Sequence, residues 1–337
     1  MKTKITFTAI LIILIILSTS LIALAHVPRT GNENESLKDA EMVDDPTKSW
    51  VVYSELHEKR EAQYYKMEMD EGEDLKLSLL VPGDGLVPNL VIMGPGIETN
   101  HTLPEYMDRP ENAGSKVIEG ELGEREYEPF TPGSYYHPAE YEENVEESGT
   151  YYAAVFSNES GGKYGLAVGY EERYGPVEWI RVPIDVVNIH IWEGQSLWLI
   201  FAPMILVLGG GLSGSIWWKY RYEEGPEDVK EWGLLTASFL YIGSGAMLLM
   251  QMGLAASKSS PGVGLILTLI FALLPIVFGI LLWKNSDDFK DPERRSRVKV
   301  IVYGIIGLFV WAGLIIGPIL AIISALLPKR ITEFLQP

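Results

Sequence analysis

The five histidines are the side chains best suited to acid–base or metal chemistry, and all precede the long apolar runs of the second half of the chain. They are His26, His57, His101, His137 and His190. A serine nucleophile needs a base within hydrogen-bond reach. The Gly211-Leu-Ser-Gly214 sequence has no such partner in its apolar run, and we interpret it as a small-residue packing surface. His57-Glu58 lacks the second histidine of the H-E-x-x-H zinc motif. We therefore expect no enzymatic activity.

His26 provides the sharpest metal hypothesis. It follows Ala23-Leu-Ala25, a small-residue sequence of the kind that signal peptidase cleaves. Cleavage there would let the new α-amino group and the imidazole of His26 bind copper together, with His101 or His137 completing the ligand set. Another interpretation is that a histidine follows the cleavage site by chance. A copper-handling protein is therefore the alternative function, with copper as the alternative to no cofactor.

Two clusters of carboxylates suggest calcium as a further hypothesis, because calcium prefers oxygen ligands. The first cluster falls in one turn and the second in a later segment: Asp70, Glu71, Glu73 and Asp74, and Glu142, Glu143, Glu146 and Glu147. Neither has the D-x-D-x-D-G spacing of a calcium loop. Charge runs of this kind are usually solvated faces.

Charge and apolarity are divided sharply along the chain. Residues 26–195 hold 35 acidic and 13 basic residues, a net charge of −22, whereas the remainder nets +4. Phosphate contacts require a basic surface, so nucleic acid is not an expected partner. The division predicts an acidic, water-facing domain joined to a membrane region.

Five apolar runs are each long enough to cross a bilayer core, which needs about 20 residues per helix. Residues 5–24 follow Lys2 and Lys4, and we interpret residues 1–25 as a signal peptide or an uncleaved anchor. The other runs predict an all-α module of four transmembrane helices within residues 196–327, followed by a short tail, residues 328–337. The four expected spans are 196–218, 232–254, 261–283 and 300–326.

Basic residues orient this multi-pass protein in the plasma membrane. Loops 219–231 and 284–299 are rich in lysine and arginine, so they are expected to be cytoplasmic. Residues 26–195 are then extracytoplasmic, and four spans would also place the C-terminus outside. Lys329 and Arg330 run against the rule at that end.

The exported region has no cysteine, so its core has to be stabilised without disulfides. With about 170 residues it is long enough to bury such a core. Sequons at Asn34, Asn100 and Asn158 are compatible with a glycoprotein.

Period-two alternation predicts an all-β antiparallel sandwich over residues 26–172. Leu75, Leu77 and Leu79 alternate with polar residues, and Tyr65, Met67 and Met69 do the same in the preceding run. We expect these two runs to form a hairpin around the turn at residues 70–73. Further strands are expected at residues 90–93, 151–156 and 164–170.

These strands carry a family resemblance. The segments Ala62–Met69, Gly72–Leu79, Gly149–Val155 and Gly162–Val168 resemble the pre-peptidase C-terminal type of β-sandwich. The resemblance covers about 120 residues and implies an exported, non-catalytic accessory domain. The chain departs from that family in a long insertion, residues 94–138, and in the membrane segments that follow. Taken whole, it also resembles predicted membrane proteins that join an exported domain to four helices.

Residues 173–195 predict an amphipathic helix lying along the membrane surface. Ile180, Ile184, Val187 and Ile191 fall at helical spacing between Trp179 and Trp192. Such a helix would hold the exported domain at a fixed attitude.

We therefore expect a non-enzymatic membrane protein whose sandwich binds a ligand or partner, such as another membrane or cell-surface protein. The expected spans contain no Asp, Glu, Lys, Arg or His, so they are interpreted as an anchor or docking surface in the lipid bilayer. The insertion is the expected contact surface because it gathers aromatic residues on a loop. Alternatively, these aromatics cap the sandwich core: Tyr106, Tyr127, Phe130, Tyr135 and Tyr136.

Overall fold

The computed structural model describes residues 26–327, except residues 32, 33, 223, 224, 261, 287, 288, 290 and 291. The chain divides into two compact units, and each is described by itself. The sandwich unit contains the described residues up to Glu126 and Ser134–Trp179. The helical unit contains Tyr127–Gly133 and the described residues from Ile180 onward. The predicted signal segment and the C-terminal tail lie outside the described residues.

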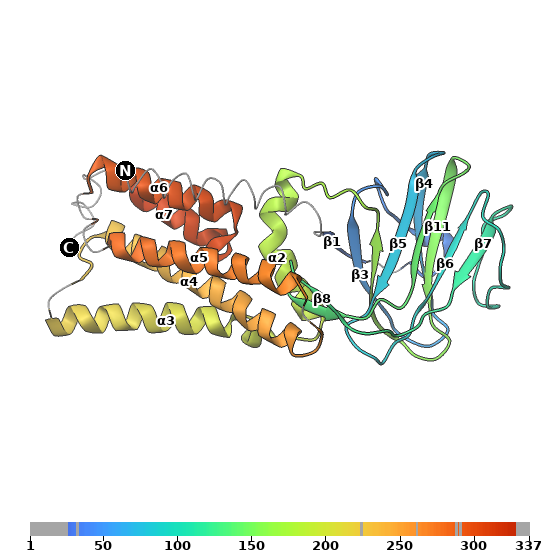
Figure 1. Ribbon diagram of the computed structural model, residues 1–337, viewed down its shortest axis with the longest axis horizontal. Helices are drawn as coiled ribbons and strands as arrows, with labels where there is room; N and C mark the ends of the chain where they lie inside the picture. The colour runs from blue at the N-terminus through green and yellow to red at the C-terminus, as the bar shows by residue number, and fades with distance from the viewer. Residues whose placement is uncertain are drawn as a thin grey trace. The chain divides into compact units, whose positions relative to one another are not determined.

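Two five-stranded sheets form the sandwich unit (Figure 1). The first has the order β1-β3-β12-β5-β10 and the second β2-β4-β11-β6-β7. The strands of the first sheet are β1 (Val27–Thr30), β3 (Trp50–Leu56), β12 (Gly162–Val168), β5 (Asp74–Leu80) and β10 (Glu140–Asn144). Those of the second are β2 (Glu41–Met42), β4 (Ala62–Met69), β11 (Gly149–Phe156), β6 (Asn89–Gly94) and β7 (Gly114–Ile118). The strands expected at residues 90–93 and 151–156 are thus confirmed, and the strand expected at residues 164–170 is β12, which begins and ends two residues earlier.

Both sheets are mixed, which corrects the expectation of a purely antiparallel sandwich. β1 pairs with β3 in parallel, and β2 pairs with β4 in parallel, while the remaining pairs are antiparallel. Each parallel strand lies at the edge of its sheet. A parallel pair needs a longer connection than a hairpin turn, and the chain between β1 and β3, which includes β2, supplies it.

The predicted hairpin at residues 62–80 is wrong. β4 pairs with β11 and β2, whereas β5 pairs with β12 and β10, so the turn at residues 70–73 carries the chain from one sheet to the other. Both strands still point their apolar residues into the shared core. A period-two pattern identifies the buried face of a strand. Because two strands show the same pattern whether they pair in a hairpin or lie in opposite sheets, the pattern could not distinguish the two arrangements.

The core between the sheets is built from aliphatic and tyrosine side chains whose hydroxyls have partners. Tyr65 and Tyr164 are fully buried, with their hydroxyl oxygens 2.6 Å apart. Tyr164 also donates to Oε1 of Gln63 at 2.6 Å. Desolvation raises the pKa of Tyr65 to about 12, although hydrogen bonds oppose the shift. Buried polar groups cost free energy unless they are paired, so this network lets tyrosine fill a cysteine-free core.

Six α-helices form most of the described part of the helical unit: α2 (Pro176–Trp192), whose first turn belongs to the sandwich unit, α3 (Leu197–Tyr222), α4 (Val229–Ala256), α5 (Gly264–Ser286), α6 (Arg294–Phe309) and α7 (Ile316–Leu326). Three of them, α3, α4 and α5, are long and apolar enough to cross a membrane. The expected span at residues 300–326 is instead divided into α6 and α7, which meet at a bend of 115°. The region therefore has three candidate spans, or four if the bent pair is one span.

α4 is the central helix of this unit and packs against α3, α5 and α7. Its first turn is held by a capping box in which Asp228 and Glu231 satisfy each other's backbone amides. Glycines allow close approach between helices: a Cβ at Gly245 would lie 2.5 Å from the carbonyl oxygen of Ala272 in α5. Small residues commonly serve this purpose in membrane helices.

Candidate functional site

None of the five aromatic residues proposed as a contact surface is exposed, and they fall in both units. Tyr106 is half-buried against the second sheet and donates to Oδ1 of Asn158 at 2.8 Å. Tyr135 is buried in β9 (Gly133–Tyr135). The half-buried Tyr136 lies under the guanidinium of Arg125, 4.9 Å from its ring centroid.

The other two aromatics belong to the helical unit. Tyr127, in β8 (Glu126–Glu128), donates to the hydroxyl of Thr268 in α5 at 2.9 Å. That hydroxyl in turn donates to the carbonyl of Pro129 at 2.7 Å. Phe130 stacks at a tilt on Phe271, with 5.6 Å between ring centroids. These contacts favour the structural interpretation of the aromatics over a binding surface.

The insertion exposes mainly carboxylate side chains. Eight acidic side chains between Gly94 and Pro138 are exposed, compared with one exposed basic residue, Arg109. Lys116 and Arg125, the other basic residues of the insertion, are half-buried. The exposed acids are Glu98, Glu105, Asp108, Glu111, Glu119, Glu121, Glu124 and Glu126. A surface of this kind attracts a basic partner and repels an acidic one.

Of the three proposed copper ligands, two lie near the first sheet and one beside the second. Nδ1 of His26 contacts the hydroxyl of the buried Ser49, and His137 contacts that of Ser78 at 3.4 Å. His101 follows Asn100, which is hydrogen-bonded to β7 at the edge of the second sheet. Among the described residues, no group of three or more His, Asp or Glu side chains is placed to hold a metal.

The ring of His26 favours its neutral form. The residue as a whole is exposed, but its Nδ1 faces the buried hydroxyl of Ser49. Desolvation, followed by the charge of His137, lowers the pKa of His26 to about 4. A neutral imidazole can bind a metal without first losing a proton.

The carboxylates proposed for calcium mostly stabilise turns or pair with lysines. Glu73 accepts a hydrogen bond from the backbone of Asp70 at 2.9 Å. Glu142 lies 3.0 Å from Lys76, and Glu143 pairs with Lys116, whose hydrogen bond is the largest factor that lowers the pKa of Glu143. A shallow acidic pocket of about 520 Å³ is lined by Asp70 and Glu73 of the first cluster and by Glu68.

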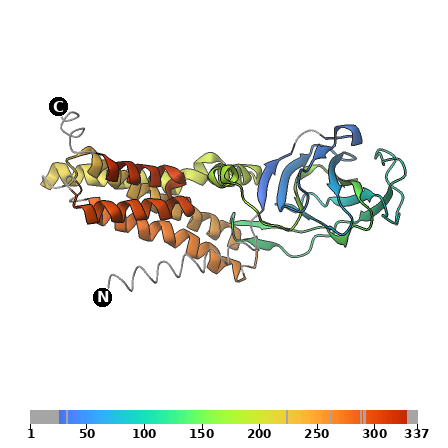
Figure 2. The same ribbon diagram turned by 90° about the horizontal axis from the view of Figure 1, so that it is seen from above.

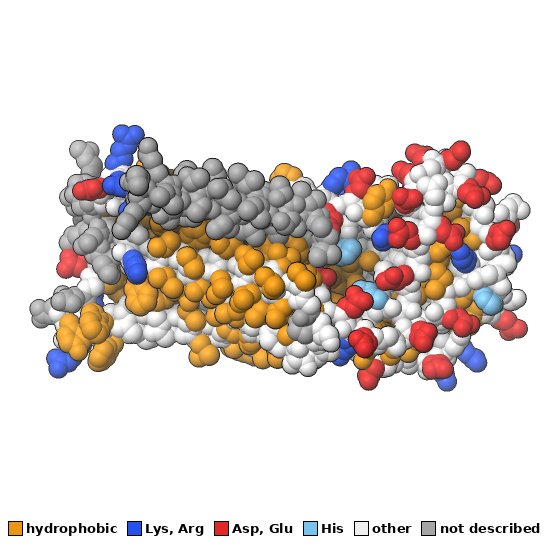
Figure 3. Space-filling view, in the orientation of Figure 1, with side chains coloured by type: hydrophobic (Ala, Val, Ile, Leu, Met, Phe, Trp, Pro, Cys, Tyr) orange, Lys and Arg blue, Asp and Glu red, His pale blue; other side chains and the backbone are white. Residues whose placement is uncertain are grey.

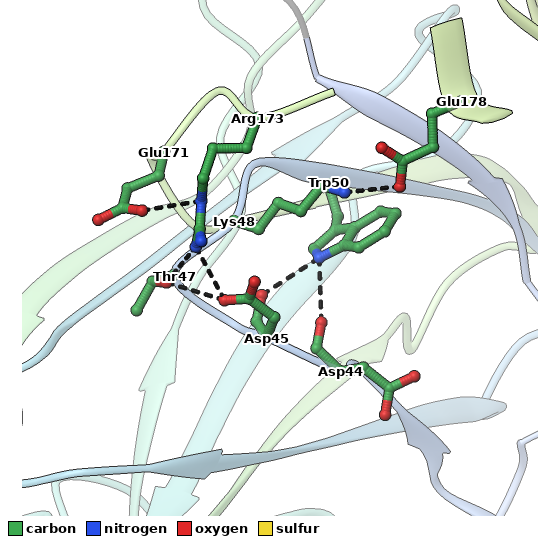
Figure 4. Close-up of polar contacts among 8 residues, drawn as sticks. All are labelled: Asp44, Asp45, Thr47, Lys48, Trp50, Glu171, Arg173 and Glu178. Carbon is green, nitrogen blue, oxygen red and sulfur yellow. Dashed lines mark hydrogen bonds and ion pairs between the residues drawn. The ribbon is translucent and has the colours of Figure 1, made fainter. Parts of the chain in front are cut away.

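A polar cluster that sequence reasoning missed holds the chain where it leaves the last strand of the sandwich (Figure 4). We call it the exit clamp, and it consists of Asp44, Asp45, Thr47, Lys48, Trp50, Glu171, Arg173 and Glu178. The backbone of Glu171 and Tyr170 donates to Thr47 at 2.8 and 3.0 Å, and Ser49 donates to Glu171 at 2.9 Å. The segment after β12 is thus bound as an added parallel bridge.

Side chains strengthen this attachment. Arg173 lies 3.1 Å from Asp45 and from the hydroxyl of Thr47, and 2.9 Å from Glu171. The indole of Trp50 donates to the carbonyls of Asp44 and Asp45 at 3.1 and 3.2 Å (Figure 4). The position before this segment requires glycine, because Gly169 has φ +81° and a Cβ there would lie 2.3 Å from the carbonyl of Lys48.

The first turn of α2 is held by the same cluster. Lys48 forms an ion pair of 2.6 Å with Glu178, and its ammonium lies 4.3 Å from the ring centroid of Trp50. Glu178 also accepts a hydrogen bond from the backbone of Gly175 at 2.6 Å. Desolvation raises the pKa of Glu178, but Lys48 and the Gly175 amide outweigh it and leave the pKa lowered. The carboxylate is therefore charged at neutral pH.

The sequons differ in their surroundings. The side chain of Asn34 is fully buried and donates to the carbonyl of Tyr64 at 2.6 Å, so the folded sandwich leaves no room for a glycan there. Asn100 and Asn158 are exposed. Only these two fit the expectation of a glycoprotein.

Comparison with known proteins identifies no family. No family model matches the chain, and no curated protein matches it. The resemblance to the pre-peptidase C-terminal sandwich therefore stays a prediction. The function has to be argued from the residues of this chain.

Proposed function

We propose that this chain is a non-enzymatic, multi-pass membrane protein that presents its sandwich outside the cytoplasm as a binding domain for a basic surface on another membrane or cell-surface protein. The observation that carries the proposal is that the insertion exposes eight carboxylates and one basic side chain. Paired charges at the rim of an interface speed association and select partners. The acidic insertion replaces the aromatic residues as the proposed contact surface.

The exit clamp supports this proposal because a presented domain benefits from a stiff attachment. A flexible linker would let the sandwich swing freely, whereas the clamp ties residues 169–178 to the sandwich by backbone bonds and ion pairs. α2 exposes an apolar stripe that includes Val177, Ile180 and Ile184. We assign this stripe to the bilayer surface, between the flanking Trp179 and Trp192.

The test is capture of the full chain with its neighbours from native membranes after mild cross-linking. The variant Glu98→Gln, Glu105→Gln, Glu111→Gln removes three charges from the insertion. We expect it to lose about tenfold or more of the captured partner, and we expect about 0.5 M salt to release the partner from the unmodified chain.

The matched control removes three exposed charges outside the insertion: Glu58→Gln, Glu71→Gln, Glu159→Gln. It should retain capture within about twofold, because the loss of long-range attraction alone is small at physiological salt. Equal loss in both variants would contradict a specific contact surface. Capture that is insensitive to salt and to both variants would contradict the electrostatic proposal altogether.

Copper handling is the second candidate, and the proximity of His26 and His137 favours it. After desolvation, the charge of His137 lowers the pKa of His26 to about 4, so His26 is neutral at physiological pH. After cleavage, the α-amino group and imidazole of His26 would provide two nitrogen ligands and His137 a third. Copper would have to displace the contact between His26 and Ser49.

Mass spectrometry of the mature N-terminus and of bound metal tests this candidate. It requires a chain that begins at His26, retains copper at about micromolar free metal, and loses it in His137→Ala or when one residue precedes His26. His101→Ala should retain copper because His101 lies beside the other sheet. A different N-terminus, or a metal-free mature protein, would exclude copper handling by this route.

A further inference from the structure

The bend between α6 and α7 is a turn with irregular backbone. Trp311, Leu314 and Ile315 have positive φ values of 47°, 55° and 71°. Left-handed conformations are uncommon for bulky residues. Val310 and Trp311, and then Gly313, Leu314 and Ile315, depart from α-helical geometry, so the helix is interrupted here rather than simply kinked.

Each arm of this bend is too short to cross a bilayer. α6 has 16 residues and α7 has 11. At about 1.5 Å per residue the arms measure about 24 and 16 Å, compared with a hydrocarbon core of about 30 Å. α6 also begins with a basic stretch, including Arg294 and Arg295, which shortens its apolar part further.

The two arms pack side by side, as the red ribbons in Figures 1 and 2 show, and the chain turns by 115° between them. The guanidinium of Arg297, in the first turn of α6, lies 3.4 Å from the carbonyl of Ala325, in the last turn of α7. Farther along, a Cβ at Gly304 would lie 2.5 Å from Ile322. The start of α6 is therefore beside the end of α7.

Contacts with α4 show how far the pair α6 and α7 extends along that helix. Near the start of α4, a Cβ at Gly233 would lie 2.4 Å from the hydroxyl of Ser324. At the tip of the hairpin, the amide of Gly313 donates to the hydroxyl of Ser244 at 2.8 Å. Ser244 lies about 22 Å along α4, which is about 42 Å long. The tip therefore reaches only the middle of a helix that can span the membrane.

We propose that α6 and α7 form a re-entrant hairpin, which enters the bilayer on the side where α4 begins, turns near mid-membrane and returns to the same side. The chain then crosses the membrane three times, and residues 328–337 follow on the side of the α5–α6 loop. Irregular backbone at membrane depth is tolerated where protein surrounds it. Ser244 and the carbonyl of Trp311 satisfy the amides of Gly313 and Leu314 at the tip.

This topology removes the conflict in the charge pattern. Lys329 and Arg330 now join Arg294, Arg295 and Arg297 on one side of the membrane, as the positive-inside rule requires. The inference uses the membrane location from the proposed function. It does not depend on which side is the cytoplasm, because it concerns only the relation of two loops and one terminus.

The absence of cysteine in the chain provides a clean test, since each introduced cysteine is the only one present. The full chain is made with Ser257→Cys between α4 and α5, Glu293→Cys before α6, or Thr332→Cys in the tail. Intact cells are treated with a membrane-impermeant maleimide and compared with permeabilised cells. We expect Ser257→Cys to react in intact cells, and Glu293→Cys and Thr332→Cys to react only after permeabilisation.

The proposal is tested by which of the three introduced cysteines react on the same side of the membrane. Thr332→Cys reacting together with Ser257→Cys, on the side opposite Glu293→Cys, would overturn the re-entrant hairpin. Thr332→Cys and Glu293→Cys both reacting from outside would retain the hairpin and contradict only the orientation in the proposed function. A fluorescent protein that folds only in the cytoplasm, either fused after Pro337 or inserted at Glu293 in the α5–α6 loop, gives an independent readout: the same result at both positions supports the hairpin, and opposite results contradict it.

Discussion

The sandwich and helical units place their apolar side chains in opposite ways. In the sandwich, Leu75, Leu77 and Leu79 are buried between the sheets, and the outer surface carries carboxylates. In the helical unit, many large apolar side chains point outward, such as Leu206 and Ile266. Figure 3 shows the contrast: orange hydrophobic side chains cover the helices and red carboxylates cover the sandwich. The surface of the sandwich unit therefore suits water, whereas the helical unit has the apolar surface and helix lengths suited to a membrane.

The largest expected effect comes from separating the two units. Residues 26–179 expressed alone should be soluble and β-rich and should unfold cooperatively with no effect of reductant, because they contain the whole sandwich core and the exit clamp. Residues 180–337 should need detergent. Circular dichroism and sedimentation without detergent check both. A helical fragment that is soluble without detergent, or a sandwich fragment that is disordered, would contradict the difference proposed between the two units.

A pair of identical substitutions should then separate the units by stability. Leu79 is 0% exposed and Leu206 is 74% exposed. Leu79→Ala should cost about 2–5 kcal/mol because it leaves a cavity in the core. Leu206→Ala should change stability by about 0.5 kcal/mol or less. Thermal unfolding of both variants in detergent provides the measurement, and a comparable loss in the two would show that α3 is buried by a protein partner.

Substitutions of two glycines in α4 test how closely this helix packs against α5. A Cβ at Gly245 would collide with the backbone of α5, whereas Gly253 has no atom within 4 Å of such a Cβ. Gly245→Ala should cost about 1–3 kcal/mol through overpacking. Gly253→Ala should be neutral or stabilise the helix, by up to about 1 kcal/mol. The midpoint of thermal aggregation in detergent should rank the two variants in that order, and a reversed order would refute the close packing of α4 on α5.

The smallest predicted effect is the pH dependence of the exit clamp. Because the folded protein lowers the pKa of Glu178 below its ordinary value of 4.5, the ion pair stabilises the clamp above that pH. The stabilisation, about 1 kcal/mol for a partly exposed pair, is lost as the pH falls through the lowered pKa. Lys48→Met should abolish this dependence.

Hydrogen exchange at the Gly175 amide, which donates to Glu178, reports on the clamp directly. In residues 26–179 its protection should fall once the pH drops below 4.5 and through the lowered pKa of Glu178, and it should already be weak in Lys48→Met. The control Lys76→Met removes a similar but more exposed ion pair, with Glu142, and should leave Gly175 unchanged. Equal protection in all three proteins would contradict a role for the Lys48–Glu178 pair.

The sequence predicts which face of a strand or helix is buried better than it predicts which other strand or helix that element packs against. Alternation in β5 and β12 identified strands and their buried sides, and hydropathy located three long helices. The same alternation could not show that β4 and β5 belong to different sheets. Hydropathy likewise could not show that residues 300–326 reverse at Trp311, since a spanning helix and a hairpin within the bilayer are equally apolar.

The exit clamp could not be predicted for a related reason. Lys48 and Glu178 are separated by 130 positions, and Arg173 contacts Asp45 across 128. Each is an ordinary surface residue in its local segment, and only the pairing of the chain after β12 with residues 47–49 brings them together. Likewise, the aromatic residues of the insertion were identifiable, but their burial depends on distant partners such as Thr268.

The central claim is that the sandwich lies outside the cytoplasm and the α5–α6 loop lies inside it. Site-specific proteolysis tests this claim most directly. One form of the full chain carries a protease recognition sequence after Gly123, whose surroundings are open, and another carries it between Ser286 and Glu293. Protease added to intact cells should cut the first form and spare the second, which should be cut only after permeabilisation. Cleavage of the second form in intact cells, with protection of the first, would contradict the account.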